Sequence, residues 1–226
     1  MIPLKDDNPT RSLPFVTVSL IVANIAVFVY ELLLPPEGLE AFVGAMGVVP
    51  GDLTQAALHD PGRLLHGGMT LCTAMFVHGG IAHIAMNMLY LWIFGNNIED
   101  VMGHGRFLVF YLACGLVASF SQVAASPRSL VPMIGASGAI SGVLGAYLIM
   151  FPAARVLTLV FFVFFLRVVP IPAVIVLGIW FLLQLLNAGP MRSGGGVAVF
   201  AHIGGFVAGL VLIAGFRRRR VRQSLF

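Results

Sequence analysis

Long runs of apolar residues, separated by short polar segments with glycine and proline, dominate this chain. A helix needs about 20 apolar residues to cross the hydrocarbon core of a bilayer. The first run, "FVTVSLIVANIAVFVYELLL", has that length and exceeds the roughly 7–15 apolar residues of a signal peptide, so we expect a retained helix. The pattern predicts six membrane spans, the fourth of them short: Phe15–Leu34, Gly79–Ile98, Phe107–Ala125, Ser137–Phe151, Ile171–Gly189 and Ala198–Phe216.

One further apolar segment, "VLTLVFFVFFL" at 156–166, lies between Arg155 and Arg167. Taken as a helix, this segment extends only about 18 Å, which is too short to cross a bilayer. We therefore expect it to lie at the membrane interface on the cytoplasmic side. Counting it as a seventh span would place the arginine-rich end of the chain outside the cell, against the usual distribution of positive charge.

The composition is that of a membrane protein. Hydrophobic residues make up 59% of the chain and charged residues only 10%, whereas about 25% of the residues in soluble domains are charged. Cys72 and Cys114 are too few for a disulfide framework, and Cys114 lies inside an apolar run, where we expect it to pack. We therefore predict one all-α membrane domain over residues 1–226, with a six-helix core at about 15–216.

Positive charges are distributed unevenly between the two predicted sides of the membrane. Six spans place both termini on the same side, and with the N-terminus in the cytoplasm ten Lys and Arg residues are inside and three outside. This agrees with the excess of Lys and Arg found in cytoplasmic loops. The inner residues are Lys5, Arg11, Arg106, Arg155, Arg167, Arg217–Arg220 and Arg222, and the outer ones are Arg63, Arg128 and Arg192.

The two ends of the chain add to this topology. The tail 217–226 begins with "RRRRVR" directly after an apolar run, which favours a cytoplasmic anchor for the last helix over nucleic-acid binding. The N-terminal segment is short and has no Arg- and Ser-rich presequence, which favours a prokaryotic plasma membrane over an organelle.

The predicted linkers are unequal in length. Residues 35–78 form a long outer loop, and a loop of that length is typically functional or partly embedded in the membrane. Residues 189–196, "GPMRSGGG", form a short outer linker that we expect to be mobile because of its glycines.

Several polar side chains interrupt the apolar runs, and polar groups at membrane depth mark candidate functional sites. Taken singly, an asparagine can be interhelical glue and a histidine can be structural. Together they share one depth, because the second, fourth and sixth spans all run inward and carry their polar residues near the outer end. The set is His83 and Asn87, one turn apart on the second span, Ser137 and Ser141 on the fourth, and His202 on the sixth.

The chemistry of these groups suggests nucleophilic catalysis. A serine hydroxyl needs a nearby base, and His202 is the available imidazole. We identify no Asp or Glu at that depth, so a Ser–His dyad is expected rather than a triad. A tetrahedral intermediate needs hydrogen-bond donors, which His83, the Asn87 amide and the Ser137 main-chain N–H can provide. Ser137 also stands at the start of a helix, where N–H groups are free.

Three motifs carry a resemblance to a known family: "HIAMN" at 83–87, "GASG" at 135–138 and "AHIGGFVAG" at 201–209. On the second, fourth and sixth spans, they resemble the rhomboid family of intramembrane serine proteases over the whole six-helix core. The resemblance implies that Ser137 is the nucleophile, His202 the general base, and His83 and Asn87 the oxyanion-stabilising residues. It also implies transmembrane protein substrates, cleaved in or near their membrane-spanning segments.

Other positions take their expected roles from the same resemblance. Glu99, in "GNNIEDVMG", would be structural, and His78 would pack or form hydrogen bonds rather than catalyse. The linker 189–196 would be a cap that moves to admit substrate. Gly205 and Gly209 would let the sixth span approach the fourth closely enough for His202 to reach Ser137.

The sequence also departs from the family in two places. Some members carry a tyrosine four residues after the nucleophile, stacked on the histidine, and here that residue is Ser141. We therefore expect a hydroxyl or a water molecule to orient His202. The Trp-Arg pair that some members carry in the first outer loop is replaced by Met69 and Thr70 near the expected place.

Three other kinds of protein fit parts of the pattern. An inactive relative that binds membrane clients need not retain the whole polar set. A transporter would be expected to carry paired acidic residues at membrane depth. A metalloprotease would need suitably spaced ligands, but His78 and His83 lie about 140° apart on a helix and no H-E-x-x-H occurs. We expect neither a metal nor any other cofactor.

Overall fold

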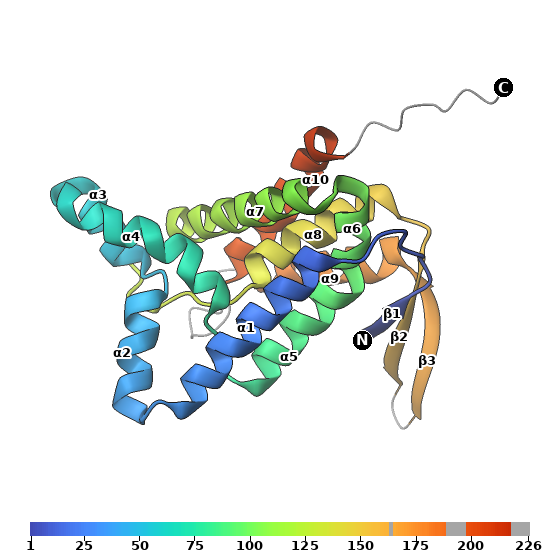
Figure 1. Ribbon diagram of the computed structural model, residues 1–226, viewed down its shortest axis with the longest axis horizontal. Coiled ribbons are helices and arrows are strands. Elements are labelled where there is room, and N and C mark those ends of the chain that lie inside the picture. Colours follow the sequence, from blue (N-terminus) through green and yellow to red (C-terminus); the bar gives the residue numbers. More distant parts are fainter. Residues whose placement is uncertain (163–164, 189–197, 218–226) are drawn as a thin grey trace.

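A bundle of long helices forms most of the molecule, and a small β-sheet lies at one end (Figure 1). The computed structural model describes residues 1–162, 165–188 and 198–217. The second predicted run is a continuous helical segment that includes a π-helical turn: α5 (Ile81–Tyr90), η2 (Leu91–Gly95) and α6 (Asn96–Met102). The other predicted runs form α1 (Phe15–Leu33), α7 (His104–Ala125), α8 (Ser137–Met150), α9 (Ala173–Asn187) and α10 (Val199–Phe216).

The helices differ in whether they are long enough to cross a membrane. Among the described residues, α1, α7 and α10 are long and apolar enough to do so. Residues 67–76 and 81–102 give a fourth span if they are counted together, although they are bent by 84°. With 14 and 15 residues, α8 and α9 are shorter apolar helices. These helices are typical of an integral membrane protein, and the count of six spans stays a prediction.

The segment predicted as a long outer loop is largely helical. It contains α2 (Pro36–Met46), α3 (Pro50–His59), α4 (Pro61–Thr73) and the short 3₁₀ turn η1 (Ala74–Phe76). Each of the three α-helices begins with proline. Proline suits the first helical position because its φ is already helical and its missing N–H would have had no partner there. The prolines therefore start helices here, where the sequence had indicated only loop.

The apolar segment 156–166 forms β-strands, which corrects the helical length estimate and adds a sheet to the predicted all-α fold. Strands β2 (Arg155–Phe162) and β3 (Phe165–Pro172) form an antiparallel hairpin, and β1 (Ile2–Asp6) pairs with β2. Valine, threonine and phenylalanine favour strands. Val156 and Thr158 face inward, while Leu157 is exposed, as strand alternation requires. Pro170 lies on the edge strand, where a missing donor is tolerated.

Helices α8 and α10 approach each other so closely that only glycine fits between them. A side-chain carbon on Gly205 would collide with the main-chain oxygen of Gly138, and one on Gly209 with that of Gly142. Across the same contact, a carbon on Gly145 would collide with the oxygen of Phe206. The predicted close approach through Gly205 and Gly209 is confirmed. Cys114 is fully buried and lies against Gly142, so its predicted packing role is also confirmed.

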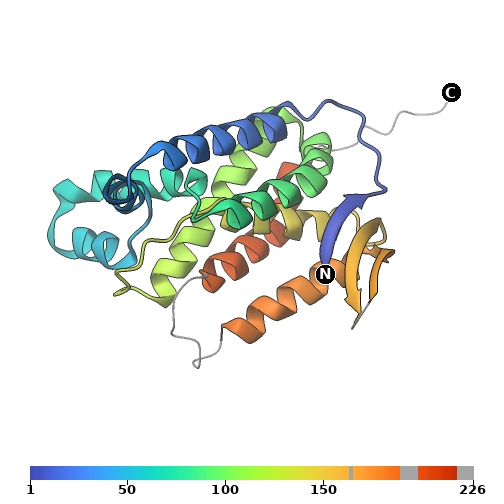
Figure 2. The ribbon, with the colours of Figure 1, turned by 90° about the horizontal axis from the view of Figure 1, so that it is seen from below.

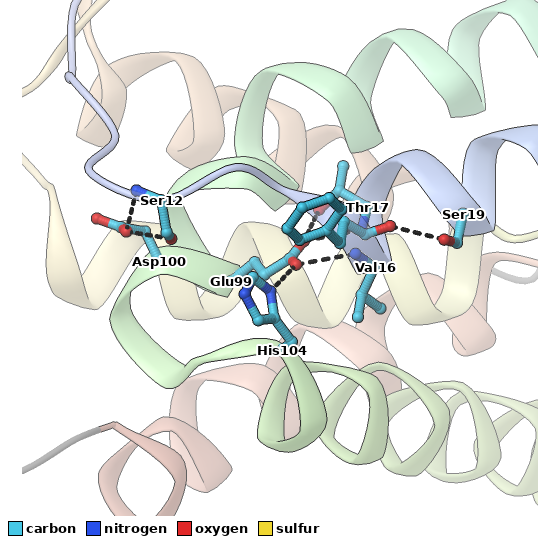
Figure 3. Close-up of polar contacts among 8 residues, drawn as sticks. Ser12, Val16, Thr17, Ser19, Glu99, Asp100 and His104 are labelled. Carbon is cyan, nitrogen blue, oxygen red and sulfur yellow. Dashed lines mark hydrogen bonds and ion pairs between the residues drawn. The ribbon is translucent and has the colours of Figure 1, made fainter.

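Glu99 joins α6 to the beginning of α1, as Figure 3 shows. Its carboxylate accepts the main-chain N–H groups of Val16 (2.9 Å) and Thr17 (2.8 Å). It also accepts the Thr17 hydroxyl (2.7 Å) and lies 2.6 Å from Nδ1 of His104. Because α1 has no side-chain cap of its own, Glu99 satisfies N–H groups that would otherwise be buried without a partner. The structural role predicted for Glu99 is confirmed.

Replacing Glu99 with alanine is expected to lower the free energy of unfolding by about 3 kcal/mol, because it leaves buried donors unpaired. The neighbouring Asp100→Ala is the matched control. Asp100 accepts hydrogen bonds from Ser12 in an exposed position, so we expect a loss below about 1 kcal/mol. Thermal unfolding in detergent micelles measures both, and equal losses in the two variants would contradict a special role for Glu99.

Candidate functional site

Ser137 and His202 meet between α8 and α10. Ser137 is the first residue of α8, and His202 lies in the first turn of α10. The Ser137 hydroxyl lies 2.8 Å from Nε2 of His202, so it can donate a hydrogen bond to that nitrogen. The contact lies one turn from the Gly138–Gly205 crossing, which fixes how far apart the two helices are. Residues separated by 65 positions are thus brought into direct contact.

The other nitrogen of the His202 ring contacts Gln184 of α9. Nδ1 lies 3.0 Å from the Gln184 side-chain oxygen. The Trp180 ring, one turn earlier on α9, lies 6.0 Å from the His202 ring, centroid to centroid. Figure 2 shows α9 running beside α10 along one side of the bundle. The sequence reasoning missed Gln184, although an amide within the apolar stretch "WFLLQLL" is the kind of signal that had singled out Asn87.

The Ser141 hydroxyl forms its described hydrogen bond within α8 and not with His202. The hydroxyl donates to the main-chain oxygen of Ser137, 2.6 Å away and one turn earlier on α8. This is a common local bond for serine inside a helix. A hydroxyl or a water molecule was expected to orient His202. The Ser141 hydroxyl bonds its own helix instead, and the described contact at Nδ1 of His202 comes from the Gln184 amide.

His83 faces Ser137 across the space that a side chain at Gly135 would occupy. A β-carbon built on Gly135 would lie 2.7 Å from Nε2 of His83 and 3.8 Å from the Ser137 hydroxyl oxygen. Gly135 has φ +116°, a conformation that favours glycine. The main-chain N–H of Gly79 donates to Nδ1 of His83 (3.3 Å), which leaves the ring proton on Nε2. A donor therefore points into the space beside Ser137.

Asn87 is buried one turn after His83 on α5. Its side-chain amide donates to the main-chain oxygen of His83 at 3.1 Å. An asparagine amide has two protons, so one hydrogen bond does not exhaust it. Within the described part of the chain we find no direct contact between Asn87 and Ser137, and its predicted oxyanion role stays a prediction.

His78 and Glu31 form a buried group next to His83. The Glu31 carboxylate accepts the main-chain N–H of His78 (3.2 and 3.3 Å), and the His78 ring packs edge-on against that of His83. The packing role predicted for His78 is confirmed. Glu31 corrects the expectation that no Asp or Glu lies at this level, because it is a buried carboxylate near the C-terminal end of α1. Its described contact is with His78 and not with His202, so it does not complete a triad.

Gln122 of α7 holds the beginning of α10. Its side-chain oxygen accepts the main-chain N–H groups of Phe200 (3.1 Å) and Ala201 (3.3 Å). These N–H groups lie in the first turn of α10, where partners within the helix are lacking, and the Ala201 N–H also reaches the main-chain oxygen of Ala198 at 3.0 Å. The sequence reasoning missed this helix cap because the two partners of Gln122 lie 78 and 79 positions away along the chain.

Two other predicted features lie outside the described residues. They are the linker 189–196, predicted to move and admit substrate, and most of the arginine tail.

The chain is similar to a family model and to several known proteins. A family model described as "Rhomboid domain" matches residues 66–219. "Rhomboid protease GluP" of Bacillus subtilis is 35% identical over 144 residues, which are 64% of this chain and 25% of the relative. "RHOMBOID-like protein 4" of Arabidopsis thaliana is 29% identical over 218 residues, 88% of this chain and 52% of the relative.

A third similar protein comes from yeast. "Rhomboid protein 1, mitochondrial" of Saccharomyces cerevisiae is 30% identical over 151 residues, 63% of this chain and 40% of the relative. The chain thus spans between a quarter and about half the length of these relatives.

Gly135→Ala is expected to lower the free energy of unfolding by about 2 kcal/mol, because alanine is strained at positive φ. The new methyl group would also meet the His83 ring. Gly178→Ala on α9 is the control, because no described atom lies within 4 Å of its added carbon, and we expect it to be neutral or slightly stabilising. Thermal unfolding in detergent compares the two, and an unchanged midpoint for Gly135→Ala would argue against strain at this turn.

Proposed function

The chain belongs to the rhomboid family, and from this premise we propose that it is an intramembrane serine endopeptidase. It cleaves transmembrane protein substrates in or near their membrane-spanning segments, with Ser137 as the nucleophile and His202 as the general base. The observation that carries this proposal is the 2.8 Å contact between the Ser137 hydroxyl and Nε2 of His202. A hydroxyl that donates to an imidazole nitrogen is arranged for proton transfer as it attacks.

The reaction follows from this contact. Oγ of Ser137 forms a bond to the scissile carbonyl carbon while its proton moves to Nε2 of His202. The carbonyl electron pair moves onto oxygen, giving a tetrahedral oxyanion. When the intermediate collapses, the C–N bond breaks and protonated His202 gives its proton to the leaving amine. Water then attacks the serine ester with His202 again as base, which releases the new carboxylate and restores Ser137.

Three groups are arranged to stabilise the oxyanion. Nε2–H of His83 points into the space beside Ser137, and the second amide proton of Asn87 remains for a ligand. Helix α8 begins at Ser137 without a side-chain cap, so its first main-chain N–H groups have no partner within the helix. Together with the positive end of the helix dipole, these donors favour negative charge at the point where it develops.

The proposed topology has six spans with both termini in the cytoplasm of a prokaryotic cell. Helices α5, α8 and α10 all begin at the end of the molecule away from the sheet (Figure 1). His83, Ser137 and His202 therefore lie toward one face, which the distribution of Lys and Arg makes the outer one. In this arrangement the sheet of β1, β2 and β3 is at the cytoplasmic interface, and bilayer lipid surrounds the bundle.

Cleavage of a model single-span substrate in reconstituted vesicles tests the assignment. We expect Ser137→Ala and His202→Ala each to lower kcat/KM by about 10³-fold or more, because nucleophile and base act as one unit. Ser19→Ala is the control, since it removes a hydroxyl that bonds only its own helix, to the Phe15 oxygen at 2.7 Å. If either dyad variant cleaves at the wild-type rate, the corresponding role is wrong.

Covalent labelling provides a separate check on the nucleophile. A fluorophosphonate probe is expected to modify the wild-type protein at Ser137 and to leave Ser137→Ala unlabelled. Incubation with a metal chelator should change neither labelling nor cleavage, because the proposed nucleophile and base are side chains that act without a metal ion. A wild-type protein that binds membrane clients but neither labels nor cleaves would instead support the inactive, client-binding alternative.

A further inference from the structure

Gln184 provides the described hydrogen-bond contact to His202 on the side of the ring opposite Ser137. It lies in the last turn of α9, half-buried, with its side-chain oxygen 3.0 Å from Nδ1. We propose that Gln184 is a positioning residue, which fixes the tautomer and the ring orientation of His202. This inference rests on the proposed function, since it assigns a role within the same dyad.

The chemistry of the Gln184 amide determines the tautomer of His202. A carbonyl oxygen can only accept a hydrogen bond, so the proton of a neutral His202 must be on Nδ1. The lone pair is then on Nε2, where the Ser137 hydroxyl lies 2.8 Å away. In the opposite tautomer, the lone pair of Nδ1 would face the lone pairs of the amide oxygen, and Nε2–H would face Ser137 without being able to accept its proton. Gln184 therefore selects the form that can act as a base.

The groups around the His202 ring restrict its orientation. Ser137 on α8 holds one nitrogen and Gln184 on α9 holds the other, so the two contacts define the plane of the imidazole. Trp180 lies against the same ring from α9 and restricts its tilt. The titratable side chain that faces Ser137 from α5 is His83. Within the described residues no carboxylate contacts the ring, so a neutral amide takes the place that an acidic residue has in a triad.

A purely structural role for Gln184 is the competing explanation. A buried amide in an apolar helix can simply hold α9 against α10, and bonds between membrane helices often do so. The two roles differ in what they predict for a carboxylate at this position. Glutamate keeps an acceptor near Nδ1 and would favour the charged imidazole, whereas a structural amide would gain nothing from that change.

The test compares Gln184→Met with Gln184→Glu in the vesicle cleavage assay. Methionine has a similar length and no acceptor, and we expect it to lower kcat about 10–100-fold with little change in KM. Glutamate is expected to retain more activity than methionine and to move the acidic limb of the pH profile of kcat/KM to higher pH, because its charge favours protonated His202. Leu183→Ala, at an exposed neighbouring position of α9, controls for general disturbance of the helix.

A spectroscopic measurement separates this proposal from the proposed function. Nitrogen-15 chemical shifts of the histidine rings, with His202 assigned from the His202→Ala variant, report the tautomer whether or not the protein cleaves anything. We expect the Nδ1–H form in the wild-type protein and a mixture in Gln184→Met. An Nε2–H form in the wild-type protein overturns the proposal. So does a Gln184→Met variant with wild-type kcat and ring shifts, or equal losses in the methionine and glutamate variants with no change of the pH limb.

Discussion

The close crossing of α8 and α10 is the contact on which the rest of the site depends. At Gly138 and Gly205, and again at Gly142 and Gly209, one backbone lies against the other with no room for a side chain. In a bilayer, apolar side chains gain little by leaving lipid for protein, so such packing rather than the hydrophobic effect holds helices together. Because Ser137 lies next to the first of these crossings, the separation of the two backbones sets its distance to His202.

The contacts of Glu99 and of the β-sheet lie at the other end of the bundle from the proposed dyad. At one end, Glu99 ties α6 to the start of α1, and β1 pairs with the hairpin that follows α8. At the other end, α5, α8 and α10 begin, and their dipoles place partial positive charge around Ser137. Gln122 satisfies the first turn of α10 without adding a charge. The end that holds the proposed dyad thus has anchoring contacts of its own, while the first main-chain N–H groups of α8 still have no partner within that helix.

The sequence predicted the apolar helices and the meeting of His83, Ser137 and His202, because both follow from local rules of length and polarity. The strands at 156–166 were missed because the length argument assumed a helix, whereas the β-branched and aromatic residues favour a hairpin beside β1. Gln184 and Gln122 were missed for another reason. The role of a side-chain amide depends on the group that it bonds. The partner of Gln184, His202, is 18 positions away, and the Phe200 N–H that Gln122 bonds is 78 positions away. Spacing along the chain does not reveal such pairs.

The choice of an amide beside His202 has a physical logic. In the proposed reaction a carboxylate there would stabilise the imidazolium, but it would also favour a protonated His202 at rest, which cannot act as a base. The chain does place a carboxylate near the site, Glu31, yet that group accepts the main-chain N–H of His78. The role proposed for Gln184 is to keep His202 neutral and aligned. In the proposed mechanism, stabilisation of the transition state then falls mainly to the oxyanion donors, which are His83 and the first N–H groups of α8.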